Sequence, residues 1–440
     1  MKLFQQMLVA TASLGLIAPI AAQASDVINL EGMNDYNRSK KSSSTRFDSN
    51  TFVNEVNEDL AILKGRVDGL EAQQNNFEAG SFSDTTTLDG SVVFSVGSTD
   101  TDDDFYTGAV KSNYTYTWNL NSSFTGDDNL YVGIEAGNGG TDFTGPNFRL
   151  DSTNNGDDSL KITSLYYQFP INNWEIATGT LLDNDDLMPT TTSTYSDGFF
   201  LGGYSTLSSN FYVFQGTGSG LAVARSFDNG FNFSGSVIGT GASTSSGFLT
   251  KEGIDVLTLS AGYDSDNYGG GVIYSKSDSL CNLAEQALTT FCNDFEVAAL
   301  ADEGYNTTSI GAYWKPDNDK TTLSITTNIV DLEAKGIDID TIADFQFGID
   351  HEIGNGVLSA SWKTIPFYKI PDLNKAVIKG DDTGSYIEVY YTYNVNDSLQ
   401  IKPGIAFAMP ADDANSNTTD DVYTYLYDWT AVGVEAAFKF

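Results

Sequence analysis

The sequence predicts an all-β protein, a 16-stranded antiparallel transmembrane β-barrel with an N-terminal periplasmic coiled-coil helix. Three observations favour this class. Beyond Gly80, apolar and polar residues alternate with a period of two in many short runs, as in strands with one apolar and one polar face. Short turns and long loops alternate between these runs. The last run, residues 431–440, puts Val432 and Val434 on one face and ends on Phe440, which is typical of a closing barrel strand.

The first 24 residues predict a secretory signal peptide. Lys2 precedes an apolar run over residues 7–20, and the Ala-Gln-Ala sequence of residues 22–24 is a cleavage site, so we expect cleavage after Ala24. The apolar run is short for a spanning helix and contains Pro19, which disfavours a signal anchor. No other continuous apolar stretch in the sequence could cross a bilayer as a helix. Any membrane-spanning part is therefore expected to consist of strands.

The next two segments are a linker and a helix. Residues 25–50 are polar and predict a flexible periplasmic linker. Residues 51–79 predict a coiled coil, because apolar side chains recur at spacings of three and four. Gly65 and Gly69 each weaken an isolated helix by about 1 kcal/mol relative to Ala, so the helix needs partners. We interpret it as a coil between subunits; a helix packed on its own barrel, or plugging it, is the alternative. The seam consists of Val53, Val56, Leu60, Leu63, Val67 and Leu70.

Residues 80–440 predict the barrel domain. Sixteen runs with strand periodicity lie at about 88–96, 111–120, 130–136, 160–169, 173–180, 219–227, 231–239, 255–263, 268–275, 307–315, 321–328, 343–351, 356–364, 384–393, 398–406 and 431–440.

The connections between these runs give the barrel an orientation. Those after even-numbered strands are mostly tight, and those after odd-numbered strands are mostly long. This asymmetry is typical of outer-membrane barrels, with turns at the periplasm and loops outside. Both termini are then expected in the periplasm. A soluble β-helix or a multidomain sandwich does not predict this alternation. The tight turns are residues 170–173, 228–230, 264–267, 316–320, 352–356 and 394–397.

The period-2 pattern also assigns the two faces of the barrel. Charged side chains on the polar parity are expected to line the lumen: Lys111, Glu135, Glu175, Lys363, Glu388 and Lys402. Aromatic clusters on the strands are candidates for the interfacial girdles: Tyr114, Tyr116, Trp118, Tyr386, Tyr390, Tyr391, Tyr393, Tyr423, Tyr425, Tyr427 and Trp429.

The loop over residues 181–219 is our candidate for the pore constriction. It is the longest loop, and it holds more apolar material, including Leu187 and Met188, than an exposed loop needs. Such a loop has reason to fold inward. An outer loop at a subunit contact is the alternative, because loop length does not fix direction. If it folds inward, four carboxylates line the narrowing: Asp183, Asp185, Asp186 and Asp197.

The composition limits the partners. With 22 Lys and Arg against 59 Asp and Glu, the net charge of −37 excludes nucleic acid. An acidic lumen would favour cations, but the same charge could lie on outer loops. Cys281 and Cys292 are the only cysteines, and in an exported protein they predict one disulfide. A metal site would need further His or Cys ligands nearby.

Catalysis and cofactors are not expected. His351 is the only histidine, and a Ser-His-Asp site would also need an oriented nucleophile beside it. Residues 99–104 are acidic but lack the Gly and Glu of a calcium loop, so weak binding of divalent cations is the most they support. The sequence thus predicts no enzyme, no cofactor and no metal site.

Several segments resemble the cyanobacterial major outer-membrane porins, the SomA-like proteins related to the carbohydrate-selective porin (OprB) and iron uptake porin families. They are residues 1–10, 29–36, 60–72 and 80–90, together with the terminal Phe440. The resemblance implies a homotrimeric channel in outer-membrane lipid through which ions and small hydrophilic solutes diffuse passively. Inorganic nutrients, iron among them, or sugars are the solutes it implies.

One feature of that family is missing. Its members usually carry a surface-layer-homology module between signal peptide and coil, where this chain has only residues 25–50. This departure concerns attachment to the cell wall, which the resemblance therefore does not imply, and leaves the pore and the trimer unaffected. A structural protein that anchors or stabilises the envelope through a plugged barrel is the alternative function, and the polar lumen argues against it.

Overall fold

The computed structural model divides into two units, Met1–Gln73 and Gln74–Phe440. In the first, Leu63, Lys64, Arg66 and Val67 are helical. The other predicted coil positions, Val53, Val56, Leu60 and Leu70, lie outside the described residues, so the coiled coil stays a prediction. No helix in the described part of the chain is long and apolar enough to cross a membrane. The structure describes residues 63–64, 66–67, 85–101, 109–139, 158–195, 216–240, 242–243, 247–250, 255–277, 305–316, 320–332, 338–339, 342–366, 377–378, 383–409 and 429–440.

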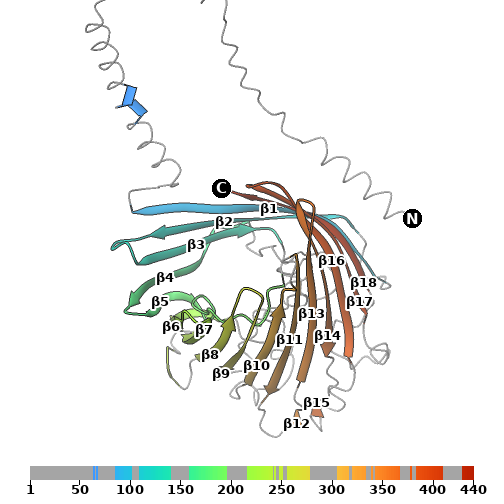
Figure 1. Cartoon of the computed structure of the whole chain (residues 1–440). Coiled ribbons are helices and arrows are strands. Elements are labelled where there is room, and N and C mark those ends of the chain that lie inside the picture. Colours follow the sequence, from blue (N-terminus) through green and yellow to red (C-terminus); the bar gives the residue numbers. More distant parts are fainter. Residues whose placement is uncertain are drawn as a thin grey trace, which may run out of the picture. The chain divides into compact units, whose positions relative to one another are not determined.

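The second unit is a closed antiparallel barrel of 16 strands (Figure 1), as the sequence predicts. Each strand pairs with its neighbours in chain order, and β1 closes the ring on β18. The barrel strands are β1 (Thr86–Thr101), β2 (Lys111–Ser122), β3 (Asn129–Gly137), β4 (Lys161–Ile171), β5 (Trp174–Asp183), β6 (Thr217–Ser226), β7 (Phe231–Gly239), β8 (Asp255–Asp264), β9 (Tyr268–Ser277), β10 (Tyr305–Trp314), β11 (Thr321–Leu332), β13 (Ile342–Ile353), β14 (Gly356–Pro366), β16 (Thr383–Asn396), β17 (Leu399–Met409) and β18 (Trp429–Lys439). A separate parallel pair joins β12 (Asp338–Ile339) to β15 (Val377–Ile378).

The strand connections are short at one end of the barrel and long at the other. Two-residue turns join β4 to β5 and β13 to β14. Asn172 in the first and Gly354 in the second have positive φ values of 56° and 63°, which the favoured two-residue hairpins require. At this short-turn end, the Gly90 N–H donates to the Phe440 carbonyl at 3.0 Å, and the Phe440 N–H donates to the Gly90 carbonyl at 3.1 Å. The C-terminal residue thus helps to close the barrel.

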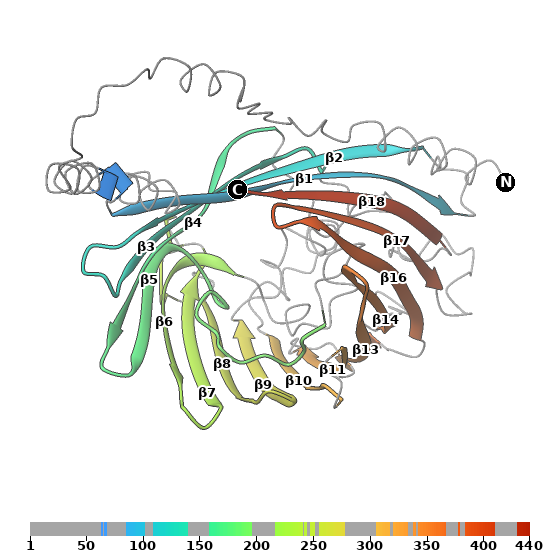
Figure 2. The same cartoon turned by 45° about the horizontal axis from the view of Figure 1, so that its top comes forward.

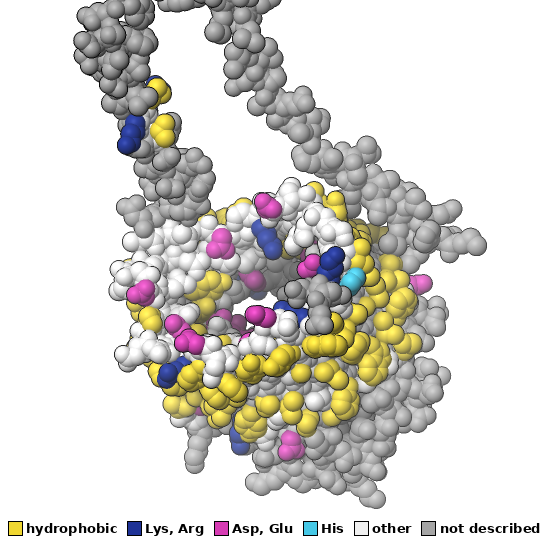
Figure 3. All heavy atoms as spheres, in the orientation of Figure 1, with side chains coloured by type: hydrophobic (Ala, Val, Ile, Leu, Met, Phe, Trp, Pro, Cys, Tyr) yellow, Lys and Arg dark blue, Asp and Glu magenta, His cyan; other side chains and the backbone are white. Residues whose placement is uncertain are grey.

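The strands are polar inside and apolar outside. On β11 and β13, Ile325 and Phe345 are more than half exposed, whereas Thr326 and Gln346, of the opposite parity, are buried. The outward positions form a broad apolar surface in Figure 3, which suits contact with lipid chains. The inward positions bury polar groups, which therefore need hydrogen-bond partners inside the barrel.

Two local predictions are wrong. Tyr386 and Tyr390 are buried inside the barrel, not placed in an outer girdle, because they share the inward parity of Glu388 on β16. Strand β5 continues to Asp183 instead of ending near residue 180. The sequence hides this because a register irregularity between Gly179 and Leu182 interrupts the simple alternation. Cys281, Cys292 and Asp197 lie outside the described residues, so the disulfide stays a prediction.

Candidate functional site

The candidate site is the barrel interior together with residues 184–195, which follow β5. We call this segment the inner strap. In Figure 2 it is the green segment that leaves β5 and runs inside the ring of strands. Its hydrogen bonds go to inward side chains of β7, β8, β11 and β16, so it follows the inner wall through a large part of the circumference.

The first residues of the strap contact the barrel wall through both hydrogen bonds and apolar packing. The buried Asn184 amide donates to Thr258 Oγ1 of β8 at 2.9 Å, and Ser236 Oγ of β7 donates to the Asn184 carbonyl at 2.9 Å. Next to this contact, Leu187 packs on a buried apolar cluster. The cluster comprises Ala177, Leu182, Ala222 and Ile238 from β5, β6 and β7. The strap is thus fixed to the wall at its first turn.

The middle of the strap lies directly on the wall backbone because the wall has glycines there. A Cβ at Gly271 of β9 would lie 2.4 Å from Thr190 Cγ2, and one at Gly311 of β10 would lie 2.2 Å from the Thr192 carbonyl oxygen. Thr190 Oγ1 also donates to Asn232 Oδ1 at 2.7 Å and lies 2.7 Å from Ser260 Oγ. Any larger inward side chain at Gly311 would push the strap toward the axis.

The described end of the strap reaches β16. The hydroxyl of Tyr195 donates to Glu388 Oε1 at 3.0 Å, while Tyr386 donates to Glu388 Oε2 at 3.2 Å. The rings of Tyr195 and Tyr390 meet edge to face with centroids 6.3 Å apart. Before this contact, the Thr194 N–H donates to Ser324 Oγ of β11 at 3.3 Å. The Glu388 carboxylate therefore accepts hydrogen bonds from both the strap and the wall.

The carboxylates at the start of the strap form an acidic turn, residues 183–186. The Asp183 N–H donates to Asp186 Oδ2 at 2.8 Å, and Thr217 Oγ1 donates to Asp183 Oδ1. Burial raises the pKa of Asp186 to about 7, the Asp183 N–H opposes this shift, and the negative charges of Asp183 and Asp185 add to it. Asp186 thus changes its charge near neutral pH.

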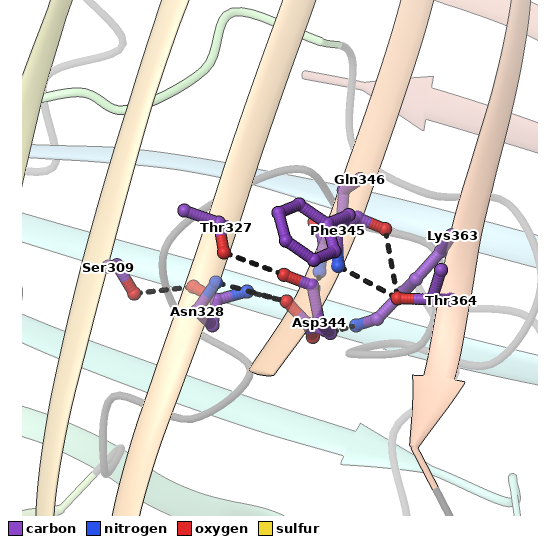
Figure 4. A network of polar contacts seen from close by, with 8 residues as sticks. All are labelled: Ser309, Thr327, Asn328, Asp344, Phe345, Gln346, Lys363 and Thr364. Carbon is purple, nitrogen blue, oxygen red and sulfur yellow. Dashed lines mark hydrogen bonds and ion pairs between the residues drawn. The ribbon is translucent and has the colours of Figure 1, made fainter. Parts of the chain in front are cut away.

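Strands β10 to β14 carry a buried polar network (Figure 4). Lys363 Nζ of β14 lies 3.5 Å from Asp344 Oδ2 of β13, with both side chains almost fully buried. Asp344 Oδ1 accepts hydrogen bonds from the Asn328 amide at 2.8 Å and the Asn328 N–H at 3.1 Å. Ser309 Oγ of β10 donates to Asn328 Oδ1, and the Gln346 amide donates to Asp344 Oδ2 at 3.4 Å. The network compensates the Lys363 charge with Asp344.

A second inward cation is paired in the same way. Lys402 Nζ of β17 lies 3.4 Å from Glu435 Oε1 of β18, and also 5.7 Å from the Tyr390 ring centroid. Of the three lysines that the sequence places in the lumen, Lys363 and Lys402 thus each have an acidic neighbour on the adjacent strand.

The remaining predicted lumen residues lie apart from the strap contacts. Lys111 stands opposite Gly97 of β1, and Glu135 of β3 stands opposite Lys161 of β4. Glu175 of β5 accepts a long hydrogen bond of 3.5 Å from the Gln168 amide. The histidine, His351 of β13, forms a hydrogen bond of 2.8 Å between its ring Nδ1 and Thr321 Oγ1.

Sequence reasoning missed Asp344 and the three inward glycines, Gly262, Gly271 and Gly311, and it did not pair Glu435 with Lys402. The sequence does contain a signal for the glycines, because a glycine inside a strand often marks a place where another backbone approaches closely. The acidic partners had none, since Asp344 and Lys363 meet only through the register of β13 with β14. In the space-filling view of Figure 3, the barrel has a hollow at its centre, and acidic and basic side chains surround this hollow.

No protein-family model matches this sequence. An uncharacterized protein of Nostoc sp. (strain PCC 7120) is 26% identical over 427 residues, which cover 84% of this chain and 71% of that protein. Among solved structures, OprB of Pseudomonas putida at high pH has a TM-score of 0.53 and 10% identity, with 81% of this chain and 94% of that chain covered. A loop L8 deletion mutant of OmpT, an outer membrane protein of Vibrio cholerae, has a TM-score of 0.51 and 12% identity, with 81% and 99% covered. At these identities the likeness shows the barrel fold.

Proposed function

We propose that this protein is a passive outer-membrane porin, a water-filled channel through which ions and small hydrophilic solutes diffuse. The observation that carries the proposal is a closed 16-strand barrel with an inner strap bound along its wall. A barrel with this many strands is too wide for its inward side chains to fill. The strap is hydrogen-bonded side-on to the wall from Asn184 to Tyr195, so it narrows the lumen from the wall inward.

The proposed location in the outer membrane is supported by the apolar outer surface of the barrel and by one structural neighbour. The outward positions form an apolar surface that requires an apolar solvent, and OmpT, which shares the fold, is an outer membrane protein. We place the short-turn end and both chain termini in the periplasm. A homotrimer joined through a coil over residues 51–79, and cargo such as inorganic nutrients, iron or sugars, follow from the sequence resemblance and belong to the proposal.

The charges of the interior favour cations. Asp183, Asp185 and Asp186 belong to the acidic turn, where β5 passes into the strap, whereas Lys363 and Lys402 each have a neighbouring carboxylate within 4 Å. The net charge of −37 has the same sign as the acidic turn. Cation preference is thus the expected selectivity.

The test is the conductance of the purified, refolded protein in a planar bilayer, with the reversal potential recorded under a salt gradient. We expect conductance steps in groups of three and a cation-selective reversal potential. Heat-unfolded protein is the control. Anion selectivity would contradict the charge assignment and leave the channel intact. Folded barrels that carry no current would contradict the channel and favour a plugged barrel that anchors the envelope.

A further inference from the structure

One arginine faces outward on the apolar side of the barrel. On β6, Ala222 and Ala224 are buried inside, and Leu221, of the opposite parity, is 49% exposed on the outside. Arg225 has the outward parity of Leu221 and pairs with Phe233 of β7, which is also exposed. Arg225 is one residue from the end of β6, next to the turn to β7. It therefore lies on the outer surface near the short-turn end.

Aromatic rings hold this arginine. Its guanidinium carbon lies 4.5 Å from the ring centroid of Phe227 and 5.4 Å from that of Trp174 on β5. The ring of Phe227 meets Phe233 edge to face, with centroids 5.9 Å apart. Cation–π contacts attract the guanidinium to both rings. We call Trp174, Arg225, Phe227 and Phe233 the arginine patch.

Within the described part of the chain, no ion pair involves the guanidinium of Arg225. Its Nε is buried without a hydrogen-bond partner, and the ion pairs of the described residues join Lys363 to Asp344 and Lys402 to Glu435. Cation–π contacts compensate the charge but satisfy no N–H group. The guanidinium fork matches the oxygens of a phosphate in a bidentate geometry. Because Arg225 as a whole is only partly buried, the outer N–H groups of its guanidinium can meet an anion with two acceptor oxygens.

The surface around the patch indicates what carries that anion. Leu221, Leu257 and Leu259 extend the exposed apolar face from the patch toward the middle of the strands. An arginine costs about 2–4 kcal/mol at the bilayer midplane but only about 0–1 kcal/mol near an interface, and aromatic rings also concentrate at interfaces. A phospholipid presents acyl chains and then a phosphate in this same order.

We propose that the arginine patch binds the phosphate of an anionic phospholipid in the leaflet at the short-turn end, with the acyl chains on β6 to β8. This proposal rests on the barrel being embedded in a membrane, as proposed above. A second copy of the chain fits less well. At the short-turn end of the described barrel strands, the outward positions are apolar, aromatic, hydroxyl or histidine side chains, such as Ile171, Tyr268 and Trp314, and none is Asp or Glu. A neighbouring barrel face would therefore bring no carboxylate to Arg225.

The experiment is a titration of the full-length, delipidated protein in detergent with phosphatidylglycerol, followed by intact-complex mass spectrometry. Phosphatidylcholine, whose headgroup is zwitterionic, is the comparison lipid. We expect tighter binding of phosphatidylglycerol, and about tenfold weaker binding in Arg225→Gln, because charge-assisted hydrogen bonds are lost. Lys276→Gln is the matched control, since Lys276 is an outward cation at the long-loop end of β9, away from the arginine patch. This variant should bind phosphatidylglycerol like the wild type.

Two further variants protect the test against misfolding. Arg225→Lys keeps the charge but loses the planar fork, so it should recover only part of the affinity. Trp174→Leu leaves Arg225 in place and should weaken binding less than Arg225→Gln. Equal lipid binding by the wild type and Arg225→Gln would overturn the proposal, and so would a change in subunit number without a change in lipid binding. Conductance is recorded separately: Arg225→Gln should conduct normally, so a non-conducting wild type would refute the porin and not the lipid site.

Discussion

At the scale of single residues, Gly311 determines how closely the inner strap approaches the wall. A Cβ built on Gly311 lies 2.2 Å from the Thr192 carbonyl oxygen and 2.8 Å from Thr326 Oγ1. Both distances are far below van der Waals contact, and one of the two atoms belongs to backbone. Since β10 is held by β9 and β11 on either side, the strap is the element that has to move.

We expect Gly311→Ala to displace the strap and to destabilise the barrel by about 1–3 kcal/mol, the usual cost of overpacking. The displaced strap should change the single-channel conductance. Gly235→Ala on β7 is the matched control, because its Cβ points outward, 3.2 Å from the end of the Leu259 side chain and 3.8 Å from the Thr258 carbonyl oxygen, which is ordinary contact. Thermal unfolding in detergent and bilayer recordings measure both effects. Identical unfolding and conductance in the two variants would contradict the role assigned to Gly311.

Single residues also show where sequence reasoning stops. The inward parity of Lys363 is visible in the alternation of β14, but its partner Asp344 is 19 residues earlier and meets it only through the strand register. The alternation likewise places Tyr386 and Glu388 on one face, yet the cluster of aromatic residues around Tyr386 made it a girdle candidate. Its burial beside Glu388 follows from this inward parity, and the contact of Tyr195 with the same carboxylate is set by the path of the strap along the wall.

At the scale of elements, β10, β11, β13 and β14 are joined across their inner faces by one polar network. Lys363 and Asp344 are 1% and 0% exposed. Removal of one partner of such a pair leaves a buried charge without compensation, which costs much more than the intact pair contributes.

We therefore expect Lys363→Met to lower the free energy of unfolding by about 3–5 kcal/mol. The double variant Lys363→Met with Asp344→Asn should recover most of this loss, because it leaves no buried charge and keeps a side-chain oxygen that accepts the hydrogen bonds of Asn328. Lys320→Met, in the turn between β10 and β11, is the control for removal of a lysine. The free energies of unfolding are measured by denaturant titration, in which the folded fraction is read from the difference in gel mobility between unheated and heated samples. A single variant as stable as the double one would show that the pair carries no structural role.

The elements were the most predictable part of the molecule. Sixteen strands, their antiparallel order and the alternation of short turns with long connections follow from the period-2 pattern and from turn residues such as Asn172 and Gly354. The end of β5 was not predictable, because the irregularity between Gly179 and Leu182 changes the parity inside a single strand. That irregularity carries the chain from the wall into the acidic turn.

At the scale of the whole molecule, the acidic excess and the barrel interior act on permeating ions together. The chain carries 59 acidic and 22 basic side chains, and a lumen lined by one sign of charge concentrates ions of the other sign. The acidic turn contributes to this field in a pH-dependent way, because burial raises the pKa of Asp186 to about 7. Below that pH the Asp186 carboxyl is neutral, and above it the carboxylate adds one negative charge to the lumen.

Cation selectivity should therefore rise as the pH increases from about 6 to about 8, across the pKa of Asp186, with reversal potentials under a fixed salt gradient as the measurement. The effect should be larger at low ionic strength, because the Debye length is about 10 Å at 0.1 M salt and about 3 Å at 1 M. Asp186→Asn should flatten the pH dependence and resemble the low-pH wild type throughout. Asp228→Asn, in the exposed turn between β6 and β7, removes the same charge outside the lumen and should keep the wild-type slope. An equal slope in Asp186→Asn and in the wild type would show that another group controls the lumen charge near neutral pH.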